Sequence, residues 1–234
     1  MIIHGFIKTT LLDYPGHLAS TLFTGGCNFR CPFCQNAPLL LSPSTEPRLP
    51  VNEILSYLKK RRNILDGVCI TGGEPTLCSD LKDFILLIKE MGLKVKLDTN
   101  GYKPTILQDL CDHGYVDYVA MDIKSTKEGY KEACGIANLD YSNIQRSIDY
   151  LRNGTIPYEF RTTVVRQLHT KEDLIDIAHQ LKGCRAYYLQ AFQYSETNLN
   201  REMSGYSDEE LINIYQAVSK ILPKTKLRGI DFSV

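Results

Sequence analysis

The sequence predicts an α/β protein whose parallel sheet is curled into a partial (β/α)6 barrel, TIM-like but open on one side. Short apolar segments rich in β-branched residues alternate with longer amphipathic segments along most of the chain. Parallel strands joined by right-handed helical crossovers are the usual product of that alternation. Roughly six such repeats follow the first cysteines, too few for the eight units of a closed barrel.

The strands are predicted where four to eight residues form a short apolar or alternating run between turn-forming residues. The first, at Met1–Thr10, alternates in polarity, and the short apolar segment Gly67–Ile70 is expected to be a buried strand. The later strands are predicted at Ala19–Thr24, Gly67–Ile70, Lys94–Asp98, Tyr118–Met121, Tyr158–Val165, Ala186–Ala191 and Lys226–Ile230.

The helices are predicted where apolar residues recur three and four positions apart, so that they share one face. The proline-rich stretch Pro38–Pro50 is predicted to be an ordered loop between the cysteine segment and the first helix. The helices are predicted at Val51–Arg61, Leu81–Met91, Thr105–Asp112, Tyr141–Arg152, Lys171–Leu181 and Asp208–Ile221.

Composition places the chain among ordinary globular proteins. Its 234 residues are 43% hydrophobic and 23% charged, which suits a single domain over residues 1–234. The 27 basic and 27 acidic residues cancel, so no nucleic-acid partner is expected. No apolar run approaches the ~20 residues that cross a bilayer, and residues 1–10 do not resemble a signal peptide. We therefore expect a cytoplasmic protein without membrane contact. A monomer is compatible with the sequence, which leaves the oligomeric state open.

Three cysteines, Cys27, Cys31 and Cys34, occur with C-x3-C-x2-C spacing after the second predicted strand. Thiolates are the ligands of iron–sulfur clusters, and three of them would leave one iron of a four-iron cluster open to another ligand. A zinc site normally needs a fourth ligand or a second C-x2-C pair, and the sequence has no such pair. A disulfide with a spare thiol and a set of buried thiols remain the alternatives.

Polar residues follow several predicted strands at their carboxyl ends, which is where parallel sheets place their active sites. Two glycines and an acid follow the third strand, and a second polar turn follows the fourth. Asp122 and Lys124 are two residues apart and so point to the same face. Packing explains this pattern poorly, and we interpret it as the lining of a ligand cavity. The residues are Gly72, Gly73, Glu74, Asp98, Thr99, Asn100, Gly101, Asp122, Lys124, Arg161, Thr163 (or Thr162), Gln190 and Gln193.

Other reactive side chains are predicted to be structural. His4, His113, His169 and His179 lack ligand spacing and are expected at the surface or in turns. The five remaining cysteines are scattered singly and are expected to be reduced, packed thiols. The basic run at residues 59–62 is expected to be a solvated helix end.

The cysteine triplet, with Phe33 before its last member, resembles the signature of the radical S-adenosylmethionine enzymes. The segment from Gly72 to Pro75 is similar to their glycine-rich motif, and the resemblance extends over essentially the whole chain. It implies a [4Fe–4S] cluster held by Cys27, Cys31 and Cys34, whose open iron binds S-adenosylmethionine. It also implies reductive cleavage of that cofactor to a 5′-deoxyadenosyl radical that abstracts a hydrogen atom.

Within that family the chain most resembles the activating enzymes of glycyl-radical enzymes. The subgroup that acts on anaerobic ribonucleoside-triphosphate reductase is nearest, and the activators of pyruvate formate-lyase are close. The resemblance implies a protein substrate and an electron from flavodoxin or ferredoxin. It is carried by residues 5–16, by Cys34-Gln35-Asn36, by the turn at residues 98–101 and by Asp122-Ile123-Lys124.

The same resemblance implies roles for individual residues. Asp98, Thr99 and Asp122 would help to hold a monovalent cation beside the cofactor carboxylate, and Lys124 would contact the cofactor. Gln190 or Phe192 would replace a histidine that pyruvate formate-lyase activators carry. Lys124, Asp98 and Asp122 are thus the predicted catalytic residues. The predicted cofactor-binding residues are Phe33, Gln35, Gly72, Gly73, Glu74, Asp98, Thr99, Asn100, Asp122, Ile123, Lys124, Arg161 and Gln190.

Three functions are compatible with these motifs. The leading one is generation of a glycyl radical on a partner enzyme, and the second is radical chemistry on a small molecule or peptide. The third is a sensing or electron-transfer module that uses the cluster alone. It leaves the glycine-rich turn and the Asp and Lys residues at the strand ends without a purpose.

Overall fold

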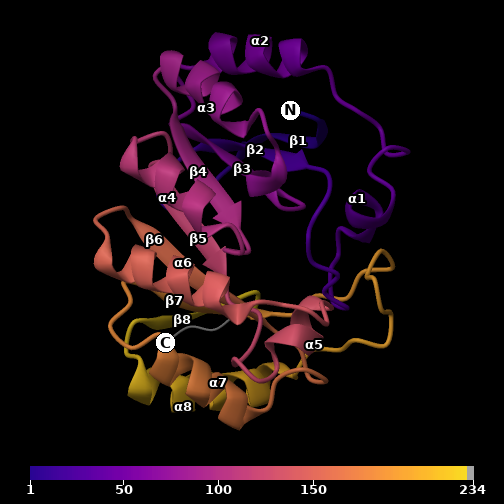
Figure 1. Ribbon diagram of the computed structural model, residues 1–234, viewed down its shortest axis with the longest axis vertical. Helices are drawn as coiled ribbons and strands as arrows, with labels where there is room; N and C mark the ends of the chain where they lie inside the picture. The colour runs from indigo at the N-terminus through magenta and orange to yellow at the C-terminus, as the bar shows by residue number, and fades with distance from the viewer. Residues whose placement is uncertain (231–234) are drawn as a thin grey trace. The chain divides into compact units, whose positions relative to one another are not determined.

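The computed structural model describes residues 1–230, and its eight strands confirm the predicted α/β class. They form one open sheet in the order β1-β2-β3-β4-β5-β6-β7-β8 (Figure 1). The predicted parallel sheet needs one correction, because β1 pairs with β2 in antiparallel fashion. The strands are β1 (Ile3–Thr10), β2 (Ala19–Thr24), β3 (Gly67–Gly72), β4 (Lys94–Thr99), β5 (Tyr118–Asp122), β6 (Tyr158–Val164), β7 (Tyr187–Ala191) and β8 (Thr225–Arg228).

The described residues divide into two compact units. The first unit comprises Met1–Asn28, Pro38–Ala120 and Thr155–Pro157, and the second comprises Phe29–Ala37, Met121–Gly154 and the described residues from Tyr158 onward. The prediction of a single domain over residues 1–234 stays a prediction, and residues 231–234 lie outside the described part.

The first unit is built on β2, β3 and β4, which pair in parallel. Its core consists of fully buried aliphatic side chains such as Leu22, Ile70 and Leu97. The helices α2 (Val51–Arg61) and α3 (Leu81–Glu90) pack against each other, and α4 (Pro104–Asp112) begins with a proline at its first turn (Figure 1). Their apolar faces explain why the helical period in the sequence located them correctly.

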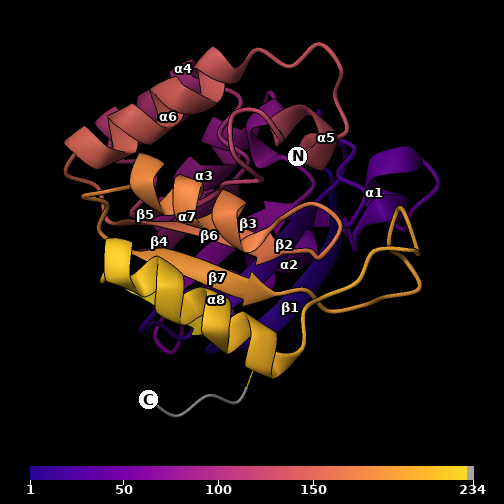
Figure 2. The same ribbon diagram turned by 90° about the horizontal axis from the view of Figure 1, so that it is seen from below.

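The second unit is built on β6, β7 and β8, which also pair in parallel. Helix α6 (Tyr141–Asn153) buries an apolar stripe, while α7 (Lys171–Gln180) and α8 (Asp208–Ile221) pack side by side (Figure 2). Capping boxes start α7 at Thr170 with Asp173 and α8 at Ser207 with Glu210. Each box satisfies backbone N–H groups that the first helical turn leaves unpaired.

Several elements differ from the sequence-based expectation. The expected loop at Pro38–Pro50 contains most of a short helix, α1 (Ala37–Leu41), and α5 (Tyr130–Cys134) was not expected. The turn η1 (Pro75–Leu77) follows β3. One-turn helices show too little periodicity to be recognised. β3, β4 and β5 also extend further than expected, so that Gly72, Thr99 and Asp122 are their last residues.

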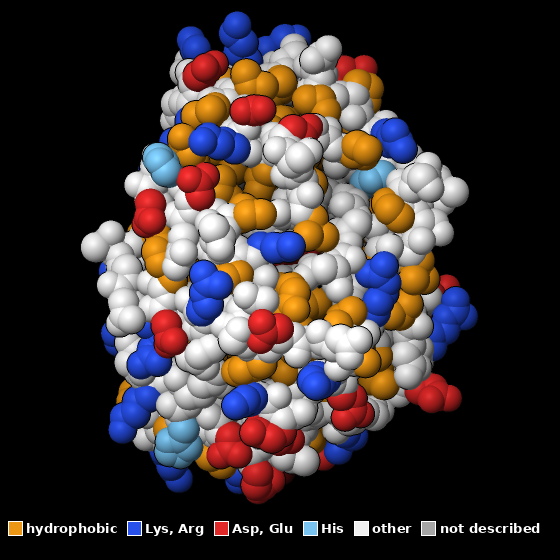
Figure 3. All heavy atoms as spheres, viewed as in Figure 1, with side chains coloured by type: hydrophobic (Ala, Val, Ile, Leu, Met, Phe, Trp, Pro, Cys, Tyr) orange, Lys and Arg blue, Asp and Glu red, His pale blue; other side chains and the backbone are white. Residues whose placement is uncertain are grey.

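No helix within residues 1–230 is long and apolar enough to cross a membrane. On the face drawn in Figure 3, basic and acidic side chains are interspersed. This mixing agrees with the zero formal charge of the chain.

Candidate active site

The three cysteines lie in the segment between β2 and α1, residues 25–36, which we call the cysteine loop. Cys27 belongs to the first unit, while Cys31 and Cys34 belong to the second, where the Cys34 N–H donates to the Cys31 carbonyl at 3.0 Å. None of the three forms a disulfide within residues 1–230. Within residues 1–230 no group of three or more His, Cys, Asp or Glu side chains is arranged to hold a metal ion. Cluster ligation by these cysteines therefore stays a prediction from their spacing.

The glycine pair after β3 packs against the backbone that leads into Cys27. The Gly73 N–H donates to the Thr24 carbonyl, and the Glu74 N–H donates to the Gly26 carbonyl, both at 2.8 Å. Gly72 has a φ of 109°, which a side chain would strain. A Cβ on Gly73 would lie 1.9 Å from the Gly26 carbonyl oxygen. Close packing against the cysteine loop is thus a structural reason for both glycines.

Glu74 is buried and connects the ends of β3 and β4. Its carboxylate accepts hydrogen bonds from the Thr76 N–H and hydroxyl, the Thr99 hydroxyl and the Asn100 N–H, at 2.5 to 3.1 Å. Burial raises the pKa of Glu74 in spite of these donors. Glu74 was expected to bind cofactor, but every contact resolved for its carboxylate is internal. The geometry is that of a side chain that positions the two loops.

Asn100, held by Glu74, directs its side chain at the first cysteine. Its Nδ2 lies 3.8 Å from Cys27 Sγ and 2.8 Å from Asn28 Oδ1, while its Oδ1 accepts from the Tyr102 N–H. Asn28 Nδ2 is buried without a hydrogen-bond partner among residues 1–230. The Asn100 donor beside the Cys27 thiol suits an electron-rich sulfur group, because hydrogen bonds to sulfur stabilise reduced iron–sulfur clusters. The residues around Cys27 therefore fit the implied cluster.

Asp98 is half-buried near the end of β4 and forms an ion pair with Lys96 two residues earlier. Thr99 points to the other side of the strand, toward Glu74. The role of Asp98 and Thr99 in holding a monovalent cation stays a prediction.

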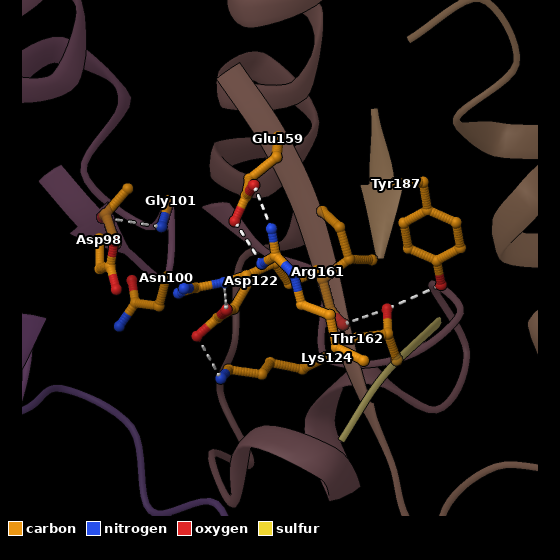
Figure 4. A network of polar contacts seen from close by, with 12 residues as sticks. Asp98, Asn100, Gly101, Asp122, Lys124, Glu159, Arg161, Thr162 and Tyr187 are labelled. Carbon is orange, nitrogen blue, oxygen red and sulfur yellow. Dashed lines mark hydrogen bonds and ion pairs between the residues drawn. The ribbon is translucent and has the colours of Figure 1, made fainter. Parts of the chain in front are cut away.

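Asp122 lies at the centre of a charged group in the second unit (Figure 4). Its carboxylate pairs with Lys124 Nζ at 3.0 Å and with Arg161 Nε at 2.9 Å, which confirms that these side chains lie together. Burial alone would raise the pKa of Asp122, but the two cations lower it to about 2. Burial would lower the pKa of Lys124, but Asp122 raises it. The group thus keeps an ammonium, a guanidinium and a carboxylate ionised together.

Lys124 is also held from its other sides. Its Nζ lies 5.6 Å from the centre of the buried Phe33 ring, in the cysteine loop, which is within the range of a cation–π contact. Its carbonyl accepts from His169 Nε2 at 2.7 Å, while His169 Nδ1 accepts from the Val165 N–H at 3.0 Å. His169 was expected at the surface or in a turn. It directly follows the turn at residues 166–168, but it is not at the surface, because it is 1% exposed. Burial lowers its pKa, so the neutral ring holds the Lys124 backbone.

The loop after β7 clamps the cysteine loop. We call Thr197–Asn200 the clamp segment, because its four residues donate hydrogen bonds to the four successive carbonyls of Pro32–Gln35. Gln35 is exposed, and its Nε2 donates to the Gln193 carbonyl. The clamp pairs are Thr197 Oγ1 with Gln35 (2.7 Å), Asn198 Nδ2 with Phe33 (3.2 Å), Leu199 N with Cys34 (3.1 Å) and Asn200 N with Pro32 (2.7 Å).

Asn198→Ala is expected to loosen the cysteine loop and to lower the free energy of unfolding by about 1 to 3 kcal/mol. Asn198 is 5% exposed, and its side chain serves both the Phe33 carbonyl and the Ser195 N–H. Hydrogen exchange should become faster in residues 32–36. Asn200→Ala is the control, because Asn200 reaches Pro32 through its backbone. Equal exchange in the two variants would contradict the clamp.

Two residues, Gln190 and Phe192, were expected to substitute for the histidine of pyruvate formate-lyase activators, and both lie on or directly after β7. Gln190 is half-buried on β7 in register with Thr163 and Arg228. Phe192 directly follows β7 and is 8% exposed. Arg228 forms a bidentate ion pair with buried Glu159 at 2.8 and 2.9 Å. Whether Gln190 or Phe192 takes the place of a histidine stays a prediction. Ile123 is fully buried, its N–H donates to the Arg161 carbonyl and its carbonyl accepts from the Thr162 hydroxyl, so its contact with a cofactor stays a prediction.

Sequence reasoning missed Asn28, Lys96, His169 and the clamp segment. Lys96 was hidden because Lys94, Val95 and Lys96 alternate like a half-exposed strand. His169 could have been found from its place directly before the capping box at Thr170. The clamp bonds depend on backbone geometry and leave no sequence pattern.

The family model described as the Radical SAM superfamily matches residues 21–181. A Methanocaldococcus jannaschii protein, provisionally named a glycyl-radical enzyme activating enzyme, is 33% identical over 98% of this chain and 97% of its own length. The pyruvate formate-lyase-activating enzyme of Clostridium pasteurianum is 28% identical over 78% of this chain and 77% of its own length.

The fold also resembles that of Streptococcus suis SuiB bound to S-adenosylmethionine. The TM-score is 0.70 at 14% identity, over 90% of this chain. The chain spans about half (52%) of the SuiB structure, so this likeness supports the fold alone. The family model and the relative matched along nearly its whole length show the family as well as the fold. The chain belongs to the radical SAM superfamily, whose enzymes use a [4Fe–4S] cluster and S-adenosylmethionine.

Proposed function

We propose that this chain activates a glycyl-radical enzyme by removing a hydrogen atom from one glycine of that partner. The observation that carries the proposal is the similarity, along nearly the whole of both chains, to the Methanocaldococcus jannaschii protein. The partner we propose is an anaerobic ribonucleotide reductase. Pyruvate formate-lyase is the alternative, and the relative from Clostridium pasteurianum supports it.

In this proposal Cys27, Cys31 and Cys34 hold the cluster. The cluster would pass one electron from reduced flavodoxin or ferredoxin to S-adenosylmethionine, whose cleavage to methionine and a 5′-deoxyadenosyl radical would allow hydrogen abstraction. Asn100 donates to the Cys27 sulfur, and Glu74 fixes Asn100. None of the eight cysteines forms a disulfide within residues 1–230, and we place the reaction in the reducing cytoplasm.

The charged group around Asp122 provides the contact with the cofactor in this proposal. Its carboxylate keeps the Lys124 ammonium in place, and His169 fixes the Lys124 backbone. A held ammonium suits a ligand carboxylate, since the lysine need not lose side-chain freedom on binding. Gly72 and Gly73 also belong to the proposed cofactor-binding set, which Phe33, Gln35, Thr99, Ile123, Arg161 and Gln190 complete.

Deuterium transfer tests the substrate. A partner enzyme that carries α-deuterated glycine is incubated anaerobically with the cluster-loaded protein, S-adenosylmethionine and reductant. We expect deuterium in the 5′-deoxyadenosine, measured by mass spectrometry, and none when the reacting glycine of the partner is replaced by alanine. Deuterium-free product with every candidate partner would contradict the proposal and favour a small-molecule substrate.

A further inference from the structure

A buried lysine in the first unit has no role in the function described so far. Lys96, on β4, is 1% exposed, and its ammonium forms an ion pair with Asp98. Its Nζ also lies 3.7 Å from the sulfur of Cys69, which is the residue paired in register with Lys96 on β3. Cys69 Sγ is in turn 3.7 Å from Asp98 Oδ1. Three side chains from two adjacent strands thus form one compact polar group.

A lone ammonium would not be stable at this place. Removing it from water costs several kcal/mol, which only a close carboxylate and further polar contacts offset. A chain that needed only to fill the space would carry an aliphatic residue here, as at the neighbouring core positions Val95 and Leu97. Packing alone therefore does not explain a lysine at position 96, and its positive charge needs another reason.

Asp98 was expected to help to hold a monovalent metal cation. One oxygen of its carboxylate is already paired with the Lys96 ammonium. A potassium or sodium ion needs several oxygen ligands with negative charge among them. Asp98 Oδ1 already has the Lys96 ammonium and the Cys69 thiol beside it. A protein cation of the same charge thus already pairs with the carboxylate that the metal cation would need.

The geometry points to Lys96 as a built-in replacement for a monovalent metal cation. It supplies the positive charge beside Asp98 and fixes the orientation of that carboxylate, so that cofactor binding does not depend on sodium or potassium. Lys96 is then a positioning residue that acts through Asp98. The inference rests on the proposed function, because it assumes that Asp98 faces the bound S-adenosylmethionine.

The test measures the dissociation constant of S-adenosylmethionine for the cluster-loaded wild-type protein. Equilibrium dialysis is performed at one ionic strength in potassium, sodium or tetramethylammonium chloride, the last cation being too large to reach a buried carboxylate. We expect the three dissociation constants to agree within about threefold, because the positive charge beside Asp98 comes from Lys96 and not from the salt. A larger weakening in tetramethylammonium would overturn the inference, and this measurement needs no variant.

Lys96→Met gives the complementary experiment. We expect binding to weaken about tenfold or more in tetramethylammonium and to recover in potassium or sodium, because a metal cation can then replace the lost ammonium beside Asp98. Lys94→Met is the matched control, since Lys94 is exposed on the same strand. Asp98→Asn with Lys96→Met should remove the cation response. Weak binding of Lys96→Met in all three salts, in a variant with native circular dichroism, would contradict replacement by a cation.

The proposed function and the role of Lys96 can fail separately. If wild-type protein binds no S-adenosylmethionine in any salt, the proposed function is wrong and this inference falls with it. If binding occurs but requires potassium or sodium, the proposed function stands and only the role of Lys96 is wrong.

Discussion

Replacing Cys34 by alanine is expected to remove the bound cluster and to slow the cleavage of S-adenosylmethionine by at least about 10³-fold, a barrier increase of ~4 kcal/mol. The motif offers three thiolates and no spare, so losing one leaves a second iron without a protein ligand. Iron content and visible absorption after anaerobic reconstitution measure the first effect. Formation of 5′-deoxyadenosine measures the second.

The matched control is Cys111→Ala, because Cys111 lies on α4 outside the motif and forms no disulfide within residues 1–230. It should retain iron and activity close to wild type. A Cys34→Ala protein with full iron content and cleavage would show that Cys34 is not a cluster ligand.

Gly73→Ala is expected to lower the free energy of unfolding by about 3 kcal/mol and to weaken cofactor binding about tenfold or more. The new Cβ would lie 1.9 Å from the Gly26 carbonyl oxygen, which is backbone and cannot move aside. The β3 loop would therefore separate from the cysteine loop and lose the bond from the Glu74 N–H to Gly26. Denaturant unfolding and equilibrium dialysis with S-adenosylmethionine measure the two effects.

Gly92→Ala is the control for Gly73→Ala, because it introduces backbone strain without a steric clash. Gly92 has a φ of 81°, but nothing lies within 4 Å of the point that an alanine Cβ would occupy. The substitution should therefore cost about 1 kcal/mol and leave binding unchanged. If Gly73→Ala behaved like Gly92→Ala, the contact with Gly26 would not be important for the site.

The sequence was most informative about the fold where many residues repeat one pattern. The 3.6-residue period located α3 and α8 closely, and apolar runs located β3 and β4, because burial of a whole face requires those patterns. It failed for β1, whose antiparallel pairing depends on a partner strand, and for one-turn helices such as α5. Local composition does not encode a pairing direction.

For the site, spacing along one strand was informative and contacts between loops were not. The two-residue separation of Asp122 and Lys124 predicted a shared face, and the structure pairs them at 3.0 Å. The burial of Glu74 beneath Asn100, and of His169 beneath Lys124, depends on how the backbones pack. Polar side chains that support other residues look the same in sequence as those that bind a ligand.

The most direct test of the central claim is electron paramagnetic resonance of a candidate partner enzyme after anaerobic incubation with this protein, S-adenosylmethionine and reduced flavodoxin. Anaerobic ribonucleotide reductase and pyruvate formate-lyase are assayed in parallel, each also with its reacting glycine replaced by alanine. We predict a glycyl-radical doublet that requires that glycine and Cys34. Cleavage of S-adenosylmethionine without a glycyl signal in any partner would contradict the claim.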